Sequence, residues 1–143
     1  MMIRLIALVA VILAVAGCGR EIKKPPQTTT IEVSYDNLLS KKHIDLPVKL
    51  AVGDTLQVIL ASNSTTGYQW TEQTTISDPA VLVQRSHFYA GPSGARPPGT
   101  AGTETWTFEA LATGTTTVAT SYGQPWPGGA KDSWTFSTTV TVR

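Results

Sequence analysis

Short runs of alternating apolar and polar residues fill most of the chain from about residue 30 onwards. A two-residue alternation is typical of a strand that buries one face, and these runs are rich in β-branched and aromatic residues, which favour strands. Turn-forming residues separate the runs, and none of the runs has a sustained 3.6-residue period. We therefore predict an all-β fold, an antiparallel β-sandwich or partly closed barrel of about 7–8 strands. The predicted strands cover residues 31–35, 44–48, 55–60, 68–71, 81–89, 103–110, 115–122 and 134–142.

A few residues within these runs indicate where each strand lies. Pro47 interrupts the run at 44–48, and we expect an edge strand there because proline lacks the N–H that a central strand needs. Trp70, Trp106 and Trp134 lie in alternating strands and should belong to the core. The polar segment 36–42 is expected to be a turn.

The N-terminal segment has the pattern of an export signal. A basic start at residues 1–4 is followed by an apolar run at 5–15 and by small residues before Cys18. The run is too short to span a bilayer comfortably, and the small residues are typical of a cleavage site. The pattern resembles a bacterial lipoprotein signal, in which the cysteine is acylated and becomes the mature N-terminus. The alternative is an ordinary signal peptide in which Cys18 is incidental.

These patterns divide the chain into three parts. We expect a lipoprotein signal peptide at residues 1–17, an extended tether at 18–29 and one folded domain at 30–143. The protein should then be exported and anchored through lipidated Cys18 to the bacterial cell membrane or outer envelope.

Composition argues against several functions. Cys18 is the only cysteine, so the domain has neither a disulfide nor a cysteine nucleophile. The 11 Lys and Arg nearly balance the 10 Asp and Glu, and the basic pairs at 23–24 and 41–42 are expected to be solvated surface. His43 and His87 have no partners at the spacing of metal ligands, and no serine has the sequence context of a catalytic nucleophile. We therefore expect no enzyme activity, cofactor, metal or nucleic-acid partner.

The segment Asn63-Ser64-Thr65-Thr66-Gly67-Tyr68 lies between two predicted strands. Asn63 and Gly67 can adopt backbone angles that other residues avoid, whereas Thr65 and Thr66 have restricted χ1 angles. The loop should therefore be narrow, rigid and preformed, which suits insertion into a cleft better than catalysis. Residues 91–102 contain three prolines and four glycines, and a loop of this length in a compact domain is usually functional or mobile.

Three loop sequences resemble motifs of one family. Asn63-Ser64-Thr65-Thr66-Gly67-Tyr68 is similar to the Asn-Pro-Thr-Thr-Gly-Tyr/Phe motif of the chagasin-like inhibitors of papain-type cysteine proteases. Gly99-Thr100-Ala101-Gly102 resembles the glycine-pair loop of that family, and Gln124-Pro125-Trp126 resembles its Arg-Pro-Trp loop. The three stretches occur in the family's order, each between predicted strands, and the match covers roughly residues 30–143.

The resemblance implies an immunoglobulin-like sandwich and an inhibitor whose partner is a papain-type cysteine protease. Loops 62–68, 91–102 and 123–128 would together occlude the active-site cleft, since loops at alternate strand junctions of a sandwich gather at one end. Thr65 and Thr66 would lie deepest, and Trp126 would pack against an aromatic wall of the enzyme. The implied protease-binding residues are Asn63, Ser64, Thr65, Thr66, Gly67, Tyr68, Gly99, Thr100, Ala101, Gly102, Gln124, Pro125 and Trp126.

Two positions depart from the family motifs. Ser64 replaces a proline, which should leave the free loop looser, and Gln124 replaces an arginine, which removes a charged donor. These departures favour the alternative hypothesis, an immunoglobulin-like cell-envelope lipoprotein that binds another protein or holds part of a wall assembly without inhibiting a protease. Under that hypothesis Trp126 could pack at a corner of the core, and residues 65–66 could be a solvated turn. In both cases we expect a monomer.

Overall fold

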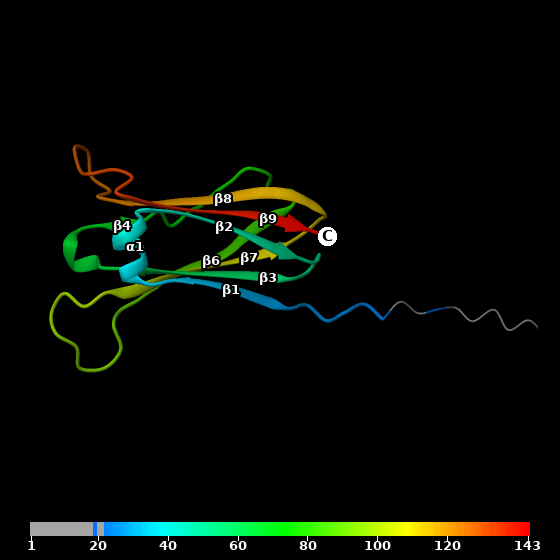
Figure 1. Cartoon of the computed structure of the whole chain (residues 1–143), viewed down its shortest axis with the longest axis horizontal. Coiled ribbons are helices and arrows are strands. Elements are labelled where there is room, and N and C mark those ends of the chain that lie inside the picture. Colours follow the sequence, from blue (N-terminus) through cyan, green and yellow to red (C-terminus); the bar gives the residue numbers. More distant parts are fainter. Residues whose placement is uncertain (1–18, 20–21) are drawn as a thin grey trace, which may run out of the picture.

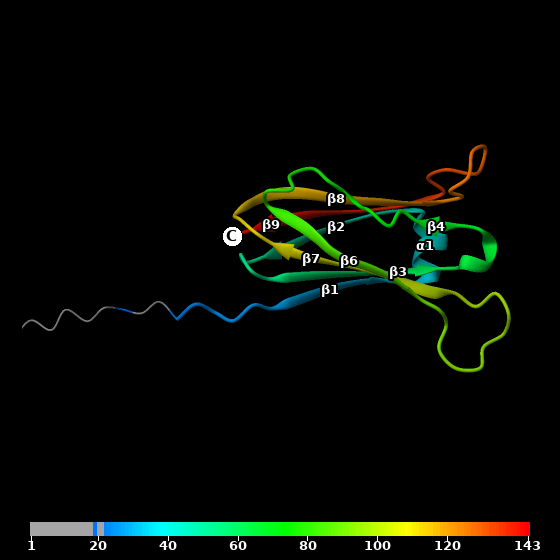
Figure 2. The ribbon, with the colours of Figure 1, turned by 180° about the vertical axis from the view of Figure 1, so that it is seen from behind.

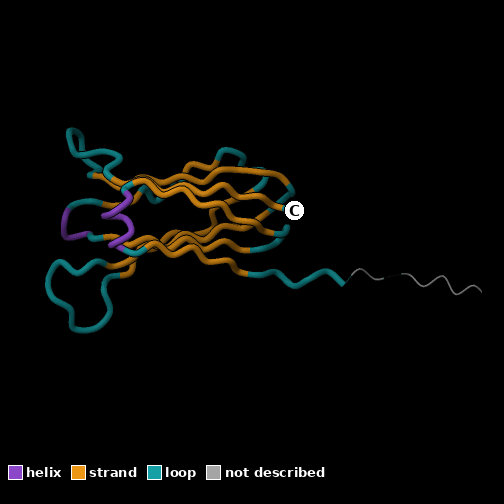
Figure 3. The backbone as a smooth tube through the Cα atoms, in the orientation of Figure 1, coloured by secondary structure: helices purple, strands orange, loops and turns teal. Residues whose placement is uncertain are grey.

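Two β-sheets pack face to face, with a short helix at one end (Figure 1; Figure 3). The computed structural model describes residue 19 and residues 22–143, so the predicted signal peptide at 1–17 and Cys18 lie outside the described residues. The elements are β1 (Thr28–Val33), α1 (Tyr35–Lys41), β2 (His43–Leu50), β3 (Thr55–Ser62), a 3₁₀ turn (Ser64–Thr66), β4 (Gln69–Trp70), β5 (Thr75–Ile76), β6 (Leu82–Ala90), β7 (Gly102–Ala110), β8 (Gly114–Gly123) and β9 (Trp134–Val142).

The strand order confirms the predicted all-β sandwich. One sheet has the order β1-β3-β7-β6, and the other has the order β2-β9-β8-β4 with β5 also paired to β8. Pro47 lies in β2, which is an edge strand as predicted.

Two strand pairs correct the prediction of a wholly antiparallel sandwich. β1 pairs in parallel with β3, and β2 pairs in parallel with β9, whereas the other pairs in both sheets are antiparallel. The first parallel pair arises because β2 lies in the opposite sheet from its neighbours in sequence. The chain reverses direction twice between β1 and β3, so these two strands run the same way.

The segment 36–42 forms most of α1, where the sequence predicted a turn. Ser34 caps the helix, because its Oγ accepts a hydrogen bond from Asn37 N (3.3 Å), and Leu38 is fully buried against the sandwich. Lys42 follows with φ +58°, outside the helical region. The helix buries a single leucine in its seven residues, so no repeated apolar period marks it in the sequence.

The folded domain begins slightly before the predicted residue 30. β1 starts at Thr28, and Gln27 is held on both sides: its N–H donates to Asp54 Oδ1 (2.9 Å) and its C=O accepts from Thr55 N (2.8 Å). The predicted tether of residues 18–29 therefore ends near residue 27. This attachment point lies at the end of the sandwich opposite α1 (Figure 1; Figure 2).

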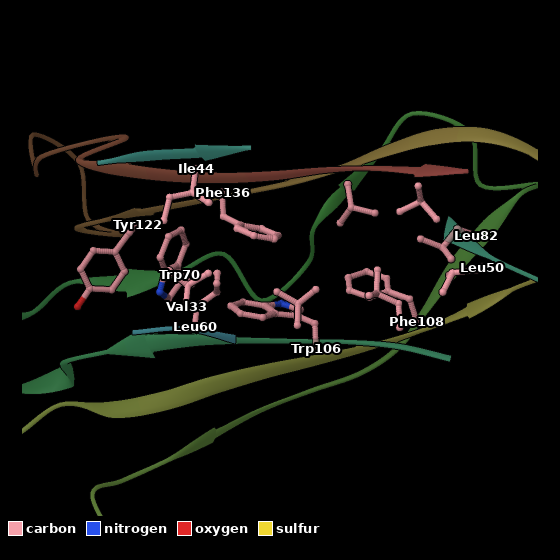
Figure 4. Close-up of a cluster of buried hydrophobic side chains, with 14 of the residues drawn as sticks. Val33, Ile44, Leu50, Leu60, Trp70, Leu82, Trp106, Phe108, Tyr122 and Phe136 are labelled. Carbon is pink, nitrogen blue, oxygen red and sulfur yellow. The ribbon is translucent and has the colours of Figure 1, made fainter. Parts of the chain in front are cut away.

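The core between the sheets contains Trp70, Trp106 and Trp134, which confirms their predicted burial. Figure 4 shows Trp70 and Trp106 between the two sheets. Trp70 and Trp106 meet edge to face with ring centroids 6.4 Å apart. The Trp70 Nε1–H donates to Ala61 O and the Trp106 Nε1–H donates to Glu72 O, both at 3.0 Å. Because residues 61 and 72 flank the loop at 62–68, these two indoles fix the chain on both sides of that loop.

Candidate functional site

Three loops lie together at one end of the sandwich (Figure 1; Figure 2). We call this end the loop pole and number its loops in chain order: first (62–68), second (91–101) and third (124–133). β3 and β6 both pair antiparallel with β7, so they run the same way and deliver the first two loops to one end. The prediction that the three loops open at the same end is confirmed.

The first loop is a 3₁₀ turn held by its own side chains. Asn63 Oδ1 accepts hydrogen bonds from Thr65 N (3.2 Å) and Thr65 Oγ1 (2.7 Å), and Thr66 Oγ1 donates to Asn63 O (2.7 Å). Gly67 closes the turn at φ +76°, in the left-handed region that favours glycine, and its N–H donates to Ser64 O (3.3 Å). Ser64, Thr65 and Thr66 are exposed at the tip, so the loop is both rigid and accessible.

Asn63 joins the first loop to its surroundings. Its side chain is buried, with 7% of the residue exposed, and Nδ2 donates to Gly99 O in the second loop (2.8 Å). Its backbone N–H donates to the Tyr122 hydroxyl of β8 (3.0 Å). Both the oxygen and the nitrogen of the Asn63 side-chain amide are thus bonded within the chain, so this residue holds the first and second loops together.

The second loop presents one open glycine and conceals the other. Gly99 has φ +84° with open space around its Cα, whereas Gly102 is buried at the start of β7. A Cβ added to Gly102 would lie 2.2 Å from Ala90 O, so glycine is needed there for the pairing of β6 with β7. Of the two glycines, only Gly99 is placed for a backbone approach by another protein.

The third loop is closed by two side chains. Gln124 Oε1 accepts from Ala130 N (2.9 Å), beside the backbone bond from Gln124 N to Ala130 O (2.7 Å). The Lys131 ammonium donates to Gln124 O and also to Trp126 O (3.0 Å). These contacts fix the backbone on both sides of Trp126.

Trp126 joins the third loop to the first. Its indole lies over Gly67, where an added Cβ would come within 2.7 Å of Trp126 Cη2. The residue is 46% exposed, so it is not sealed in a corner of the core. Trp126, Pro125 and the first loop border a groove of about 390 Å³, which has His87 and Glu104 among its lining residues.

A buried acid lies under the loop pole. Glu104, only 4% exposed, accepts a hydrogen bond from Ser62 Oγ at Oε1 (3.0 Å), and its Oε2 lies 3.5 Å from His87 Nε2. Burial raises the pKa of the Glu104 carboxyl, although the bond from Ser62 and the nearby His87 oppose the rise. Sequence reasoning did not single out this pair, but the alternation of residues 103–110 places Glu104 on the inward face with Trp106.

Comparison with known proteins decides the family. Residues 49–140 match the Chagasin family peptidase inhibitor I42. The chain is 32% identical over 103 residues to chagasin from Trypanosoma cruzi, which corresponds to 69% of this chain and 91% of chagasin. The chain belongs to the chagasin family of peptidase inhibitors.

Solved structures show the same architecture for this chagasin-family protein. The cysteine protease inhibitor EhICP2 from Entamoeba histolytica superposes with a TM-score of 0.65 at 17% identity, covering 84% of this chain and 99% of that one. Amebosin superposes with a TM-score of 0.54 at 22% identity, covering 84% and 100% of the two chains. The predicted immunoglobulin-like sandwich is confirmed.

Both departures from the chagasin-family motifs have structural roles in this member. The Ser64 hydroxyl lies 3.2 Å from the Tyr89 hydroxyl, which links the first loop to β6, and a proline could not form this bond. Gln124 acts as an acceptor inside its own loop, and an arginine carries no side-chain acceptor. The two substitutions therefore replace intrinsic stiffness and charge with hydrogen bonds that hold the loops in place.

Two features were searched for in residues 19 and 22–143, a cluster of metal-binding side chains and a membrane-spanning helix. Within these residues, no cluster of three or more His, Cys, Asp and Glu side chains is arranged to hold a metal ion. No helix in the same part of the chain is long and apolar enough to cross a bilayer.

Proposed function

We propose that this protein inhibits papain-type cysteine proteases by placing the loop pole over their active-site cleft. The observation that carries the proposal is the mutual attachment of the three loops. The first loop is bonded to the second through Asn63 and Gly99, and it packs against the third through Gly67 and Trp126. A surface fixed in this way loses little conformational entropy on binding, so more of its contact energy appears as affinity.

The conformation of the first loop explains how it would be bound without being cut. A protease attacks a peptide held in near-attack geometry, which an extended strand provides. Residues 64–66 instead form a 3₁₀ turn, and Thr66 N and Gly67 N donate to carbonyls of the same loop (both 3.3 Å). Straightening the turn would break these bonds together with those of the Asn63 side chain.

The other two loops would grip the sides of the cleft. Trp126 is about half exposed on a backbone fixed by Lys131, and tryptophan is one of the residues enriched in interface hot spots. Gly99 offers its backbone with open space around it. The tip of the first loop would therefore enter between two preformed lateral contacts.

Inhibition is tested by titrating the fragment 25–143, which contains all the strands and helices described above, against papain. We expect tight, reversible inhibition, with the fragment recovered intact by mass spectrometry. Trp126→Ala should weaken inhibition about thirtyfold, because loss of a hot-spot tryptophan costs roughly 2 kcal/mol. Leu111→Ala, at an exposed position away from the loops, is the matched control and should inhibit like the wild type. No inhibition at micromolar concentration would contradict the proposal and favour a binding module without inhibitory activity.

The proposed location is the bacterial cell envelope, with Cys18 carrying the lipid. The support is the sequence pattern of residues 1–18, in which the apolar run ends in small residues before the only cysteine. Cys18→Ser should prevent labelling by an alkyne fatty acid in a bacterial host and move the protein from the membrane fraction to the soluble one. Equal labelling of the variant and the wild type would exclude Cys18 as the acylated residue.

A further inference from the structure

An aromatic pocket opens at the loop pole, apart from the groove beside Trp126. It has a volume of about 250 Å³ and is lined by Tyr35, Thr66, Tyr68, Tyr122, Ser133 and Trp134. All six lining residues are uncharged, and four of them are aromatic. We call it the aromatic pocket.

The walls of the aromatic pocket are fixed by ring packing. Tyr122 stacks on Trp134 with centroids 4.8 Å apart, and Tyr68 stacks on Tyr122 at 5.6 Å. Tyr35 meets Trp134 edge to face at 5.4 Å. Because Tyr122 and Trp134 are themselves buried, the pocket keeps its shape in the free protein.

Helix α1 extends this apolar surface outwards. Leu39 lies one turn after Tyr35, on the same helix face, and is 51% exposed. The helix itself is held by the Ser34 cap and by fully buried Leu38, so Leu39 is presented from a fixed position. Together with the aromatic pocket, Leu39 makes a larger apolar surface than a single exposed leucine would.

We propose that the aromatic pocket and Leu39 form a fourth contact with the target protease, which accepts an apolar side chain from the rim of its cleft. The inference rests on the proposed inhibitory function. It follows from continuity: Thr66 is exposed at the tip of the first loop and also lines the pocket, so a protein seated on that tip reaches the pocket. A dry cavity of roughly 150 Å³ holds benzene, so the pocket has room for a leucine or phenylalanine side chain.

The chemistry and the position of the aromatic pocket both favour an apolar side chain of another protein as its occupant. The lining contains no Lys or Arg, so a carboxylate side chain would be desolvated there without a partner, which is unfavourable. The tether of the same chain attaches to the domain at the opposite end of the sandwich (Figure 1). Tyr35 and Leu39 belong to α1 and not to the three loops, so this contact would add to the one that the loops make and would favour target proteases with an apolar side chain at that position.

The test uses the full-length protein in detergent and a panel of papain-type proteases. Leu39→Asn removes the exposed apolar group, and Ser133→Phe fills the pocket from its own wall. Leu111→Asn makes the same chemical change as Leu39→Asn at a leucine away from the pole that is 41% exposed. We expect Leu39→Asn and Ser133→Phe to raise Ki about tenfold for the most tightly bound protease, with ratios that differ across the panel and an unchanged melting temperature for Leu39→Asn. Leu111→Asn should leave every Ki unchanged.

Three results would overturn the inference, and they are distinguishable. If Leu39→Asn and Ser133→Phe both inhibit with the wild-type Ki while Trp126→Ala is still impaired, the fourth contact does not exist but the proposed inhibitory function is still supported. If the wild type inhibits no protease of the panel, both the fourth contact and the proposed inhibitory function are refuted. A wild type that dimerises in sedimentation, together with a monomeric Leu39→Asn variant, would show that a second copy of the chain occupies the pocket.

Discussion

At Gly67, both the backbone conformation of the first loop and its packing against Trp126 require that no Cβ is present. Gly67→Ala therefore tests the geometry of the loop pole. Gly67 has φ +76°, and an L-residue in this region costs roughly 1–2 kcal/mol. The new Cβ would also lie 2.7 Å from Trp126 Cη2. Trp126 is about half exposed, so we expect the steric contact to displace its indole and not to unfold the loop.

The expected result separates stability from inhibition. The free energy of unfolding should fall by about 1 kcal/mol, equivalent to a loss of roughly 3–6 °C in melting temperature for a domain of this size. Inhibition should weaken about tenfold or more, since part of the contribution of a hot-spot tryptophan is lost when its placement changes. Urea unfolding followed by tryptophan fluorescence gives the first quantity, and progress curves with papain give the second.

Gly53→Ala is the matched control. Gly53 has φ +90°, lies in the turn between β2 and β3, and has open space around its Cα. The substitution should therefore cost a similar amount of stability and leave Ki unchanged. If Gly67→Ala also keeps the wild-type Ki while losing the same stability, the Trp126–Gly67 contact does not set the inhibitory geometry, and the reasoning is refuted.

Three further predictions concern single side chains. Lys131→Met keeps the aliphatic stem but removes the ammonium that donates to Gln124 O and Trp126 O. The third loop should therefore be cleaved faster in limited proteolysis, and Ki should rise several-fold. An unchanged cleavage rate would show that the ammonium does not close the loop. Burial raises the pKa of Glu104, so the stability that this group contributes is fully present below its unfolded pKa and is lost as pH rises through the folded pKa. Glu104→Gln should therefore gain stability relative to the wild type as pH rises above 4.5, the ordinary pKa of a glutamate, in urea titrations at a series of pH values. A difference that stays constant with pH would contradict this. Lys42 has φ +58°, so Lys42→Gly should raise the free energy of unfolding by about 1 kcal/mol, with no change or a loss counting against strain at this position.

Alternation along the sequence was sufficient to predict a β-sandwich or partly closed barrel with buried tryptophans, and the missing N–H of Pro47 predicted an edge strand. It could not predict α1, because a seven-residue helix anchored by Leu38 alone has no repeated period. It also could not predict the parallel pairs, because alternation determines which face of a strand is buried and not which strand lies beside it. The β1–β3 pair depends on the passage of the chain to the other sheet and back.

The sequence predicted where the three loops of the candidate site lie and that they gather at one end, but it did not predict which of their side chains point inward. Asn63 and Gly102 belong to the resembling motifs, and both turn out to be buried by contacts with residues distant in sequence or across a strand pair. The bond from Asn63 to Gly99 spans 36 positions, so no local pattern indicates it. Tyr35 and Leu39 were overlooked for the related reason that the helix carrying them was not foreseen.

The attachment of the chain at Gln27 determines how the domain can be presented to other molecules. Residues 19–27 span at most about 30 Å when fully extended, and they join the sandwich at the end opposite α1 and the loop pole (Figure 1). A bead, biosensor chip or fusion partner coupled ahead of β1 should therefore leave the inhibitory face free to meet a protease in solution, whereas coupling through residues of the third loop should block it. If Cys18 carries the lipid, as proposed above, the same arrangement would turn the loop pole away from the membrane.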